Sequence, residues 1–263
     1  MSGYTLGCLT AWDPVFKYRW HFPSSESLII NYTDETNRGE MHLLQPLGVL
    51  NSEVKDFIID TMHSAKYQMR IVGVEPAFLE QNPEFAAQFT ITTDRNNANY
   101  IYKASDLASL SGRRYAKKRN LIAQAVKSYS WTTEPLNMIN ISECLSLIPE
   151  SHIGKDAAAI KSAVNNFGEG LLRGILVRID NRAVAFSMFC QQTSDTVVIH
   201  FEHAQYAYKG LHQIVNQEAA KIVAEEGYTY INREEDLGDP GIRQAKESYY
   251  PDHLAESLIL TIK

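Results

Sequence analysis

The chain has 263 residues, of which 44% are hydrophobic and 21% are charged, and its formal net charge is −6. This balance excludes a disordered or fibrous protein and predicts a globular one with a sizeable core. The negative charge excludes a protein that coats nucleic acid over its whole surface, but it leaves room for a local basic patch. The length fits one large domain or two domains of ordinary size.

Three cysteines, Cys8, Cys144 and Cys190, lie far apart in the sequence and form no CxxC pair. They predict neither a disulfide framework nor a cysteine-based metal site, and a reducing cytoplasm is the expected location. No N-terminal stretch joins a basic region to an apolar run, and no apolar run approaches the ~18 residues of a membrane-spanning helix. We therefore expect a protein that is neither exported nor embedded in a membrane.

The first half of the chain predicts strands and helices in succession. Three strands come first, over YRWHF, SLIINY and MHLLQPLG, and an amphipathic helix follows over SEVKDFIIDTMHSAK with Ser52 as its N-cap. Then come a strand over YQMRIVGV, a short helix over EPAFLEQNPEF and an extended pair over FTITTDRNNANYIYK. The middle of the chain predicts a helix from Gly112 to Ser130, a strand around Trp131 to Asn140 and a capped helix from Ser142 to Ile148.

The second half repeats this order. A helix is predicted over Lys155 to Phe167, and a hairpin with its turn at Asp180-Asn181 follows. Next come a strand over TVVIHFEHAQ and the helix LHQIVNQEAAKIVAEEG, which ends at Gly227. A strand over YTYIN precedes a short helix that Asp239 caps and that reaches Tyr250, and SLILTIK forms the last strand.

Two passes of the same succession indicate two similar lobes, because the period exceeds a hundred residues and is too long for a solenoid. We predict an α/β (α+β) protein in which each lobe is a mixed, mostly antiparallel sheet flanked by helices. The expected lobes are residues 1–130 and 131–263.

This order of elements resembles the GNAT acyltransferase fold, here in tandem. The resemblance is sharpest over YIYKASDLASLSGRRYAKKRN (Tyr100 to Asn120) and YINREEDLGDPGIRQAKESYYP (Tyr230 to Pro251), which are similar to segments of one family. It is the family related to the C-terminal domain of phosphatidylglycerol lysyltransferase, whose members have two GNAT-like lobes and are related to the Fem-type transferases that use aminoacyl-tRNA. The resemblance implies an acyltransferase that requires no cofactor and takes aminoacyl-tRNA or acyl-CoA as co-substrate. The implied acceptor is an amine or hydroxyl of a small molecule, a lipid head group or a peptide.

The chain departs from this family's pattern in having no large membrane-embedded region. It also lacks the acyl-CoA motif Gln/Arg-x-x-Gly-x-Gly/Ala before the central helix, where it reads QYAYKGLHQIVNQ with Lys209 and Gly210 at the helix entry. The N-terminus of that helix still predicts an anion site, because its free N–H groups and dipole favour a phosphate.

A basic segment stands out in this acidic chain, and it ends the first of the two similar stretches. Its cations are Arg113, Arg114, Lys117, Lys118, Arg119 and Lys127, with Asn120 among them. On a helix several of them share one side, where they repel unless a polyanion compensates. We therefore predict a phosphate-bearing donor such as tRNA. A solvated helix face is the alternative.

A run of charges follows the strand that ends at Asn232. It consists of Arg233 and three acids, and Arg243 and Lys246 supply further local cations. Ligands of open α/β sheets bind at the carboxyl ends of strands. We predict Glu234 and Asp236 as catalytic groups that orient or deprotonate the acceptor. The predicted substrate-binding residues in this stretch are Asn232, Arg233, Glu235, Arg243, Lys246 and Tyr249. Helix capping by Glu235, Asp236 and Asp239 is the structural alternative.

The strand TVVIHFEHAQ places His200 and Glu202 two residues apart, so both are expected on one face, with His203 on the other. We predict that His200 binds the acceptor and that Glu202 is a further catalytic group. A metal site would need a third ligand at a convincing spacing, and we predict none.

Two other functions stay open. A non-catalytic module for nucleotides, tRNA or another ligand could keep the tandem fold, since one fold hosts many functions. An acetyltransferase that uses acetyl-CoA is the second alternative, and CoA would then stabilise the protein against heat.

Overall fold

The computed structural model describes residues 2–34, 40–148, 155–168 and 171–263, and it divides the chain into two compact units. Unit 1 comprises residues 15–98 and 255–263, and unit 2 comprises residues 2–14 and 99–254. The helix α1 (Leu6–Phe16) passes from unit 2 into unit 1.

Unit 1 is built on a mixed sheet. Its strands are β1 (Arg19–Ser24), β2 (Ser27–Asp34), β3 (Glu40–Leu44), β4 (Leu47–Gly48), β5 (Arg70–Val74), β6 (Phe89–Thr93) and β14 (Leu258–Ile262). They lie in the order β1-β2-β3-β5-β14-β6, with β4 beside β2, and the β3–β5 pair is parallel. The helices of this unit are α2 (Ser52–Ser64), α3 (Pro76–Gln81) and α4 (Pro83–Ala86).

Unit 2 is built on a second mixed sheet. Its strands are β7 (Asn99–Lys103), β8 (Thr132–Pro135), β9 (Arg173–Ile179), β10 (Arg182–Gln191), β11 (Thr196–Ala204), β12 (Tyr230–Asn232) and β13 (His253–Ala255), in the order β13-β7-β12-β11-β10-β9-β8. The helices are α5 (Ala104–Ser109), α6 (Ala116–Ser128), α7 (Glu143–Ser146), α8 (Lys155–Asn165), α9 (Leu211–Glu225) and α10 (Pro240–Glu247). Only β11 and β12 are parallel among the described pairs of this sheet.

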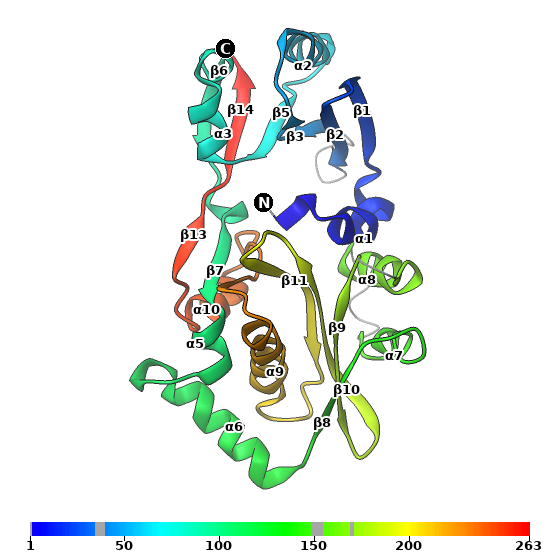
Figure 1. Cartoon of the computed structure of the whole chain (residues 1–263), viewed down its shortest axis with the longest axis vertical. Helices are drawn as coiled ribbons and strands as arrows, with labels where there is room; N and C mark the ends of the chain where they lie inside the picture. Colours follow the sequence, from blue (N-terminus) through cyan, green and yellow to red (C-terminus); the bar gives the residue numbers. More distant parts are fainter. Residues whose placement is uncertain (1, 35–39, 149–154, 169–170) are drawn as a thin grey trace. The chain divides into compact units, whose positions relative to one another are not determined.

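Helices cover both faces of the sheet of unit 2, with α9 on one face and α7 and α8 on the other (Figure 1). The core on the first face contains Leu211 and Val215 of α9 packed against strand residues such as Ile199. The core on the second face contains Ile160 of α8 and Ala11 of α1. Fully apolar runs in β9 and β10 are therefore expected, because both faces of these strands are buried.

The predicted fold class is confirmed, since two mixed sheets flanked by helices make up the described chain. The units, however, do not follow the predicted boundary between residues 130 and 131. The last strand, β14, lies between β5 and β6 of unit 1, whereas β7 lies between β12 and β13 of unit 2. A strand sequence shows that a segment is extended, but not which sheet it joins, so the sequence could not reveal this exchange.

The local signals show why several elements begin where they do. The helix α10 begins after Asp239, whose Oδ1 accepts a hydrogen bond from the amide of Ile242 at 2.8 Å, with Pro240 in the first position. This N-cap was predicted. In α2, by contrast, the cap is Asn51, whose Oδ1 accepts from the amide of Val54, and Ser52 is the first helical residue.

The exchanged strand β14 gives a first prediction. Leu260 is fully buried in the core of unit 1. Replacing it with alanine removes packing from both neighbouring strands, and a cost of about 2–5 kcal/mol is expected. Urea unfolding measures this loss. The matched control is Ile259→Ala on the other face of β14, where the side chain is partly exposed and a much smaller loss is expected. Equal losses in the two variants would contradict the placement of Leu260 in this core.

Candidate active site at the carboxyl end of β12

The ladder between the parallel strands β11 and β12 is short. It pairs Thr196 with Tyr230 and ends where Val198 meets Asn232, whereas β11 continues to Ala204 along β10. The residues that follow β12 therefore lie beside the second half of β11, but no main-chain hydrogen bonds of the sheet join the two segments there. Such carboxyl ends are where open α/β sheets bind ligands.

A β-bulge in β11 decides which side chains share a face. Ile199 pairs with Phe189 and Phe201 pairs with Met188, so His200 is the extra residue of the bulge. An extra residue shifts the alternation of side chains by one position. His200 consequently lies with the α1 and α8 side, whereas Glu202 lies on the α9 side. The predicted sharing of one face by His200 and Glu202 is therefore wrong.

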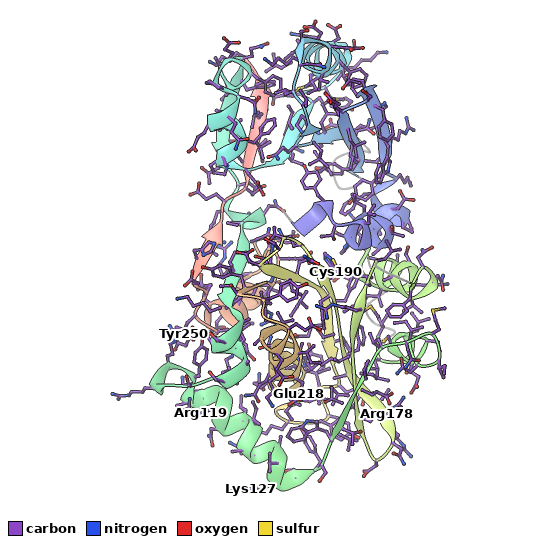
Figure 2. The ribbon with its side chains drawn as sticks, viewed as in Figure 1. Arg119, Lys127, Arg178, Cys190, Glu218 and Tyr250 are labelled. Carbon is purple, nitrogen blue, oxygen red and sulfur yellow. The ribbon has the colours of Figure 1, made fainter. Side chains whose placement is uncertain are left out.

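His200 is the centre of a polar cluster on the α1 side. Its Nδ1 lies 2.8 Å from Oε1 of Glu234, and its Nε2 lies 3.0 Å from the hydroxyl of Thr5 and 3.2 Å from the thiol of Cys190. Cys190 lies near the end of β10 (Figure 2). Burial lowers the pKa of His200, but the charge of Glu234 and hydrogen bonds outweigh burial and raise the pKa well above its ordinary value. His200 and Glu234 thus form a buried ion pair at neutral pH.

The same cluster has the spacing of a metal site. Cys8, His200 and Glu234 each offer a ligand atom, and these atoms lie within 4.8 Å of one another. Thiolate, imidazole and carboxylate suit zinc. The prediction of no metal considered His200 with Glu202 and His203, and it did not consider Cys8. Burial raises the pKa of Cys8, which favours a neutral thiol there. In the structure these groups satisfy one another through hydrogen bonds around the imidazole.

A second polar cluster lies on the α9 side. Arg233 donates from Nη2 to Oε1 of Glu202 at 2.7 Å, and its guanidinium lies 5.3 Å from the centre of the Tyr249 ring. Lys118 of α6 lies over the same ring at 3.9 Å and donates to the hydroxyl of Ser248. Burial, together with the nearby Arg233, lowers the pKa of Lys118 to about 8. The predicted residues Lys118, Glu202, Arg233 and Tyr249 are thus brought together.

Asp236 has a different environment from the other acids of its run. It is fully buried and accepts from Nε and Nη2 of Arg243 at 2.8 Å each, from the hydroxyl of Tyr100 at 2.6 Å and from the amide of Gly238. Hydrogen bonds from Arg243 hold the pKa of Asp236 far below its usual range. These contacts favour a structural role for Asp236 and Arg243, because a carboxylate this strongly paired is a weak base.

The carboxylate of Glu235 accepts a hydrogen bond from its own main-chain N–H but none from another side chain of the described residues. Burial and the neighbouring Glu234 raise its pKa to about 7. Lys246 donates from Nζ to the main-chain oxygens of Arg233, at 2.6 Å, and of Glu235. Burial and Arg233 lower the pKa of Lys246 to about 8. A carboxyl and an amine that titrate close to neutral pH lie together here, which is typical of catalytic sites.

Asn232 fixes the start of this segment. Its Nδ2 donates to Asn99 at 2.9 Å and to Gln192 at 3.0 Å, and its Oδ1 accepts from the amide of Glu234 at 2.8 Å. Glu234 itself has a left-handed backbone, with φ of 58°. The side chain of Asn232 therefore holds the turn rather than pointing to a ligand.

The basic segment separates into paired and unpaired cations. Arg114 pairs with Asp106 at 2.5 Å, and Arg119 donates to the main-chain oxygens of Leu110 and Gly112. Arg113 and Lys117 are exposed and form no ion pair with any described residue. Arg119 and Lys127 lie near the two ends of α6 (Figure 2), and Asn120 and Lys127 are also exposed. An exposed basic surface thus runs along α6.

The helix α6 packs closely against the start of α9, where an anion site was predicted. A Cβ at Gly210 would lie 2.6 Å from the main-chain oxygen of Leu121 in α6, and Gly210 has φ of 86°. The main-chain oxygen of Lys209 accepts from the hydroxyl of Tyr129. Glycine is required there because α6 packs against the helix entry.

Several residues of the site were missed in the sequence. Thr5 and Cys8 meet His200 from a distant segment, and Cys190 meets it from the neighbouring strand β10. Asn216 and His212 lie on α9 beside Glu202. Asn216 and His212 could have been found in the sequence, because they are polar residues at positions of α9 that face the sheet.

The comparisons with known proteins decide the family. A model of the family described as phosphatidylglycerol lysyltransferase, C-terminal, matches residues 1–260. The chain belongs to this family. The predicted resemblance is therefore confirmed. No curated protein matches the chain.

Solved structures support the fold. A conserved protein of unknown function from Bacteroides thetaiotaomicron is 28% identical, with a TM-score of 0.85 over 100% of this chain and 91% of that chain. L-PGS from Bacillus licheniformis is 16% identical, with a TM-score of 0.67 over 94% of this chain and 84% of that chain. FemX is 10% identical, with a TM-score of 0.64 over 97% of this chain and 90% of that chain. Family and fold together point to an acyltransferase of the lysyltransferase type. Within the described ranges, no helix is long and apolar enough to cross a membrane.

The pair of Asp236 and Arg243 gives a prediction with a defined pH dependence. The carboxyl of Asp236 has a lower pKa in the folded protein than in the unfolded chain, where the pKa is about 4. The ion pair therefore contributes its full stabilisation above about pH 4. This contribution is lost as the pH falls from about 4 through the lower pKa of the folded protein. We expect Asp236→Asn to lower the midpoint of urea unfolding at pH 7, and the difference from the wild type to shrink below about pH 4.

The control for this prediction is Asp239→Asn, because asparagine also caps a helix and the residue is exposed. Its midpoint should remain close to that of the wild type at pH 7. A difference between Asp236→Asn and the wild type that stays constant from pH 7 to pH 3 would contradict the role of the ionised carboxylate.

Proposed function

We propose that this protein transfers an aminoacyl group from aminoacyl-tRNA to an amine or hydroxyl acceptor at the carboxyl end of β12. The acceptor class extends to small molecules, lipid head groups and peptide amines. The observation that carries the proposal is the carboxylate of Glu235, which is partly buried, accepts no hydrogen bond from another described side chain and has a pKa raised to about 7. The family description, which names a lysyltransferase, supports the reaction type.

The chemistry needs a base that works near neutral pH. An ammonium acceptor must lose a proton before its nitrogen attacks the ester carbonyl of the donor. Glu235 takes one proton from the ammonium group, and the neutral nitrogen then attacks and forms the C–N bond. The nitrogen loses a second proton as the ester C–O bond breaks, one of the two protons passes from Glu235 to the departing ribose oxygen, and the other is released to water. General bases act best when their pKa is close to the working pH. Most of the remaining rate comes from holding the two reactants together.

The positive groups around Glu235 suit the charge that develops in this step. An oxyanion forms on the ester carbonyl during attack, and fixed cations stabilise it. Lys246 lies beside Glu235, and the imidazolium of His200 interacts electrostatically with the same carboxylate. Cations held by main-chain oxygens and by Glu234 need little rearrangement during the reaction.

Basic residues at the start of α6 support tRNA as the donor. Arg113, in the turn just before α6, and Lys117 of α6 are exposed cations without ion-pair partners in the part of the chain that the structure describes, and Lys118 of α6 lies near Arg233. A helix that carries unpaired cations toward an active site suits the phosphates of a tRNA. Acyl-CoA is the less favoured donor, because α6 packs against the start of α9, where a phosphate of CoA would be expected.

Removing the base tests the reaction. We expect Glu235→Gln to lower the rate of aminoacyl transfer by at least about 100-fold, since the amide cannot accept the proton. The deprotonated carboxylate is the active form, so the wild-type rate should rise as the pH rises through about 7 and then level off. The variant should lose this rise. The measurement is loss of labelled aminoacyl groups from tRNA with phosphatidylglycerol vesicles, a lysine-containing peptide or a simple primary amine as acceptors.

The matched control is Glu225→Gln, at the exposed C-terminal end of α9, which should transfer at the wild-type rate. An unchanged rate and pH profile in Glu235→Gln would remove Glu235 from the mechanism. A wild-type protein that binds tRNA but transfers nothing to any acceptor would instead identify a binding module.

Charge reversal at the start of α6 and in the turn before it tests the donor. Lys118 packs on Tyr249, so Arg113→Glu with Lys117→Glu changes charge with less risk to the fold. The double variant should bind tRNA at least about tenfold more weakly, and the slope of log affinity against log salt should fall by about 2. Filter binding across a salt series measures both values. Arg182→Glu, at the exposed first residue of β10, is the control. If the double variant keeps the wild-type slope, the donor does not contact α6.

A further inference from the structure

Sulfur and oxygen atoms of three other side chains gather around one ring nitrogen of His200. The thiol of Cys190 lies 3.2 Å from Nε2, and the hydroxyl of Thr5 lies 3.0 Å from it. The thiol of Cys8 hydrogen-bonds to the same ring, and the amide of Cys8 donates to the hydroxyl of Thr5, which places Cys8 on the Nε2 side. We call Cys8, Cys190 and His200 the two-thiol cluster.

The Nε2 atom has more neighbours than one hydrogen bond can serve. A ring nitrogen of histidine carries either one N–H group or one lone pair. The hydrogen bonds around the imidazole join the groups of the cluster, yet two thiols and a hydroxyl share a single position on the ring. A metal ion at that position would bind several of these atoms at once, since zinc takes four ligands.

The distances in the two-thiol cluster suit a zinc ion. Zinc lies ~2.3 Å from a thiolate sulfur and ~2.0 Å from an imidazole nitrogen, so two such ligand atoms of a tetrahedral site are about 3.5 Å apart. The Sγ of Cys190 and the Nε2 of His200 are 3.2 Å apart. Ligand atoms of Cys8, His200 and Glu234 also lie within 4.8 Å of one another. Small movements of the side chains would therefore bring both sulfur atoms within bonding distance of an ion at Nε2.

Glu234 holds the other nitrogen of the ring. Its Oε1 lies 2.8 Å from Nδ1 of His200. A histidine that binds a metal almost always donates its second N–H to a carboxylate, a main-chain oxygen or water, which fixes the nitrogen that faces the metal. The amide of Glu234 in turn donates to Oδ1 of Asn232, so the carboxylate is held in place. The lone pair of a neutral His200 would therefore be directed toward the two thiols.

The two-thiol cluster is enclosed by the protein. Cys8, Cys190 and His200 keep 6%, 7% and 8% of their exposure, and the imidazole itself is fully buried. Two thiolates and an imidazole favour zinc over magnesium or calcium, which prefer oxygen ligands. Cys144, the remaining cysteine of the chain, packs in an apolar core with residues such as Leu176.

We propose that the two-thiol cluster binds one zinc ion through Sγ of Cys8, Sγ of Cys190 and Nε2 of His200, with the fourth position open to water. Each thiol and Nε2 lose a proton on binding, so His200 becomes a neutral imidazole that donates from Nδ1 to Glu234. The positive charge near Glu235 then belongs to the ion. The ion also joins the first turn of α1, which carries Cys8, to the strands β10 and β11.

Metal analysis of the full chain tests the site. The protein is made without a histidine tag and dialysed against metal-free buffer that contains a reducing agent. Elemental analysis should find about one zinc ion per chain, and zinc added after chelation should bind again with a Kd of about 1 μM or tighter. Cobalt in place of zinc should give the intense visible bands of a tetrahedral ion and a near-ultraviolet charge-transfer band from thiolate. A protein that binds neither ion, or a cobalt spectrum without the thiolate band, would overturn the proposal.

Single substitutions localise the ion. Cys8→Ala and Cys190→Ala each remove a thiolate ligand and should weaken zinc binding at least about 100-fold. Glu234→Gln keeps the ligands but weakens the support of the ring, and a loss of about tenfold is expected. Cys144→Ala is the matched control, because Cys144 is also buried but lies outside the cluster, and its affinity should equal that of the wild type. Equal affinities in the wild type and both cluster cysteine variants would contradict the site.

Thermal unfolding supplies a second measurement and checks that each variant folds. A chelator should lower the Tm of the wild type and of Cys144→Ala, but not that of Cys8→Ala or Cys190→Ala, because a ligand that binds the folded state stabilises it. An equal effect of the chelator on all four proteins would refute the assignment. If one cluster cysteine variant fails to fold, the other decides, and if both fail, the cobalt spectrum of the wild type decides.

Zinc binding needs neither tRNA nor an acceptor, so the outcomes for the site and for the proposed function are separable. A wild type that binds zinc in the two-thiol cluster but takes no aminoacyl group from tRNA keeps the site and refutes the proposed function. A wild type that transfers the aminoacyl group but binds no zinc refutes the site and keeps the proposed function.

Discussion

The bulge at His200 is the constraint on which the candidate site depends. Without the extra residue, His200 and Glu202 would point to one face of the sheet, and two buried charged networks would compete for the same space. With it, Glu234 meets His200 on one side, and Arg233 meets Glu202 on the other. Consecutive residues after β12 thus supply opposite charges to opposite faces, with Glu234 in a left-handed backbone conformation.

This division gives the two faces different chemical characters. The side with α1 holds thiols, an imidazolium and the carboxylate of Glu234, while the side with α9 holds an ion pair, a tyrosine ring and unpartnered polar atoms. Glu235 and Lys246 lie at the turn that joins the two networks. An acyl group bound at that turn would have recognition groups on one side and proton-transfer groups on the other.

Local patterns predicted much of the fold, but they predicted less of the site. The hydrophobic face of α9 and the cap at Asp239 depend on neighbours in sequence, and both were found. The roles of Glu235 and Asp236 could not be told apart, because three acids in a row look alike until Tyr100 and Arg243 are placed beside one of them. Tyr100 is 136 residues from Asp236 in the sequence, and Arg243, seven residues away, could pair with any of the three acids until the fold places it beside Asp236. The bulge was equally hidden, since no glycine or proline marks it.

The exchange of strands between the units has a consequence for the order of folding. Every strand of unit 2 except the last residue of β13 precedes residue 255, whereas the sheet of unit 1 is incomplete until β14 has been made. During synthesis the chain emerges from its N-terminus, and domains fold as units once their residues are available. The segment 15–98 is translated early yet must wait for residues 258–262, with β5 and β6 each lacking a neighbour. Unit 2 therefore has all of its residues synthesised before unit 1, although most of it lies later in the chain. The unpaired strand edges of unit 1 can pair with other chains until β14 has been made.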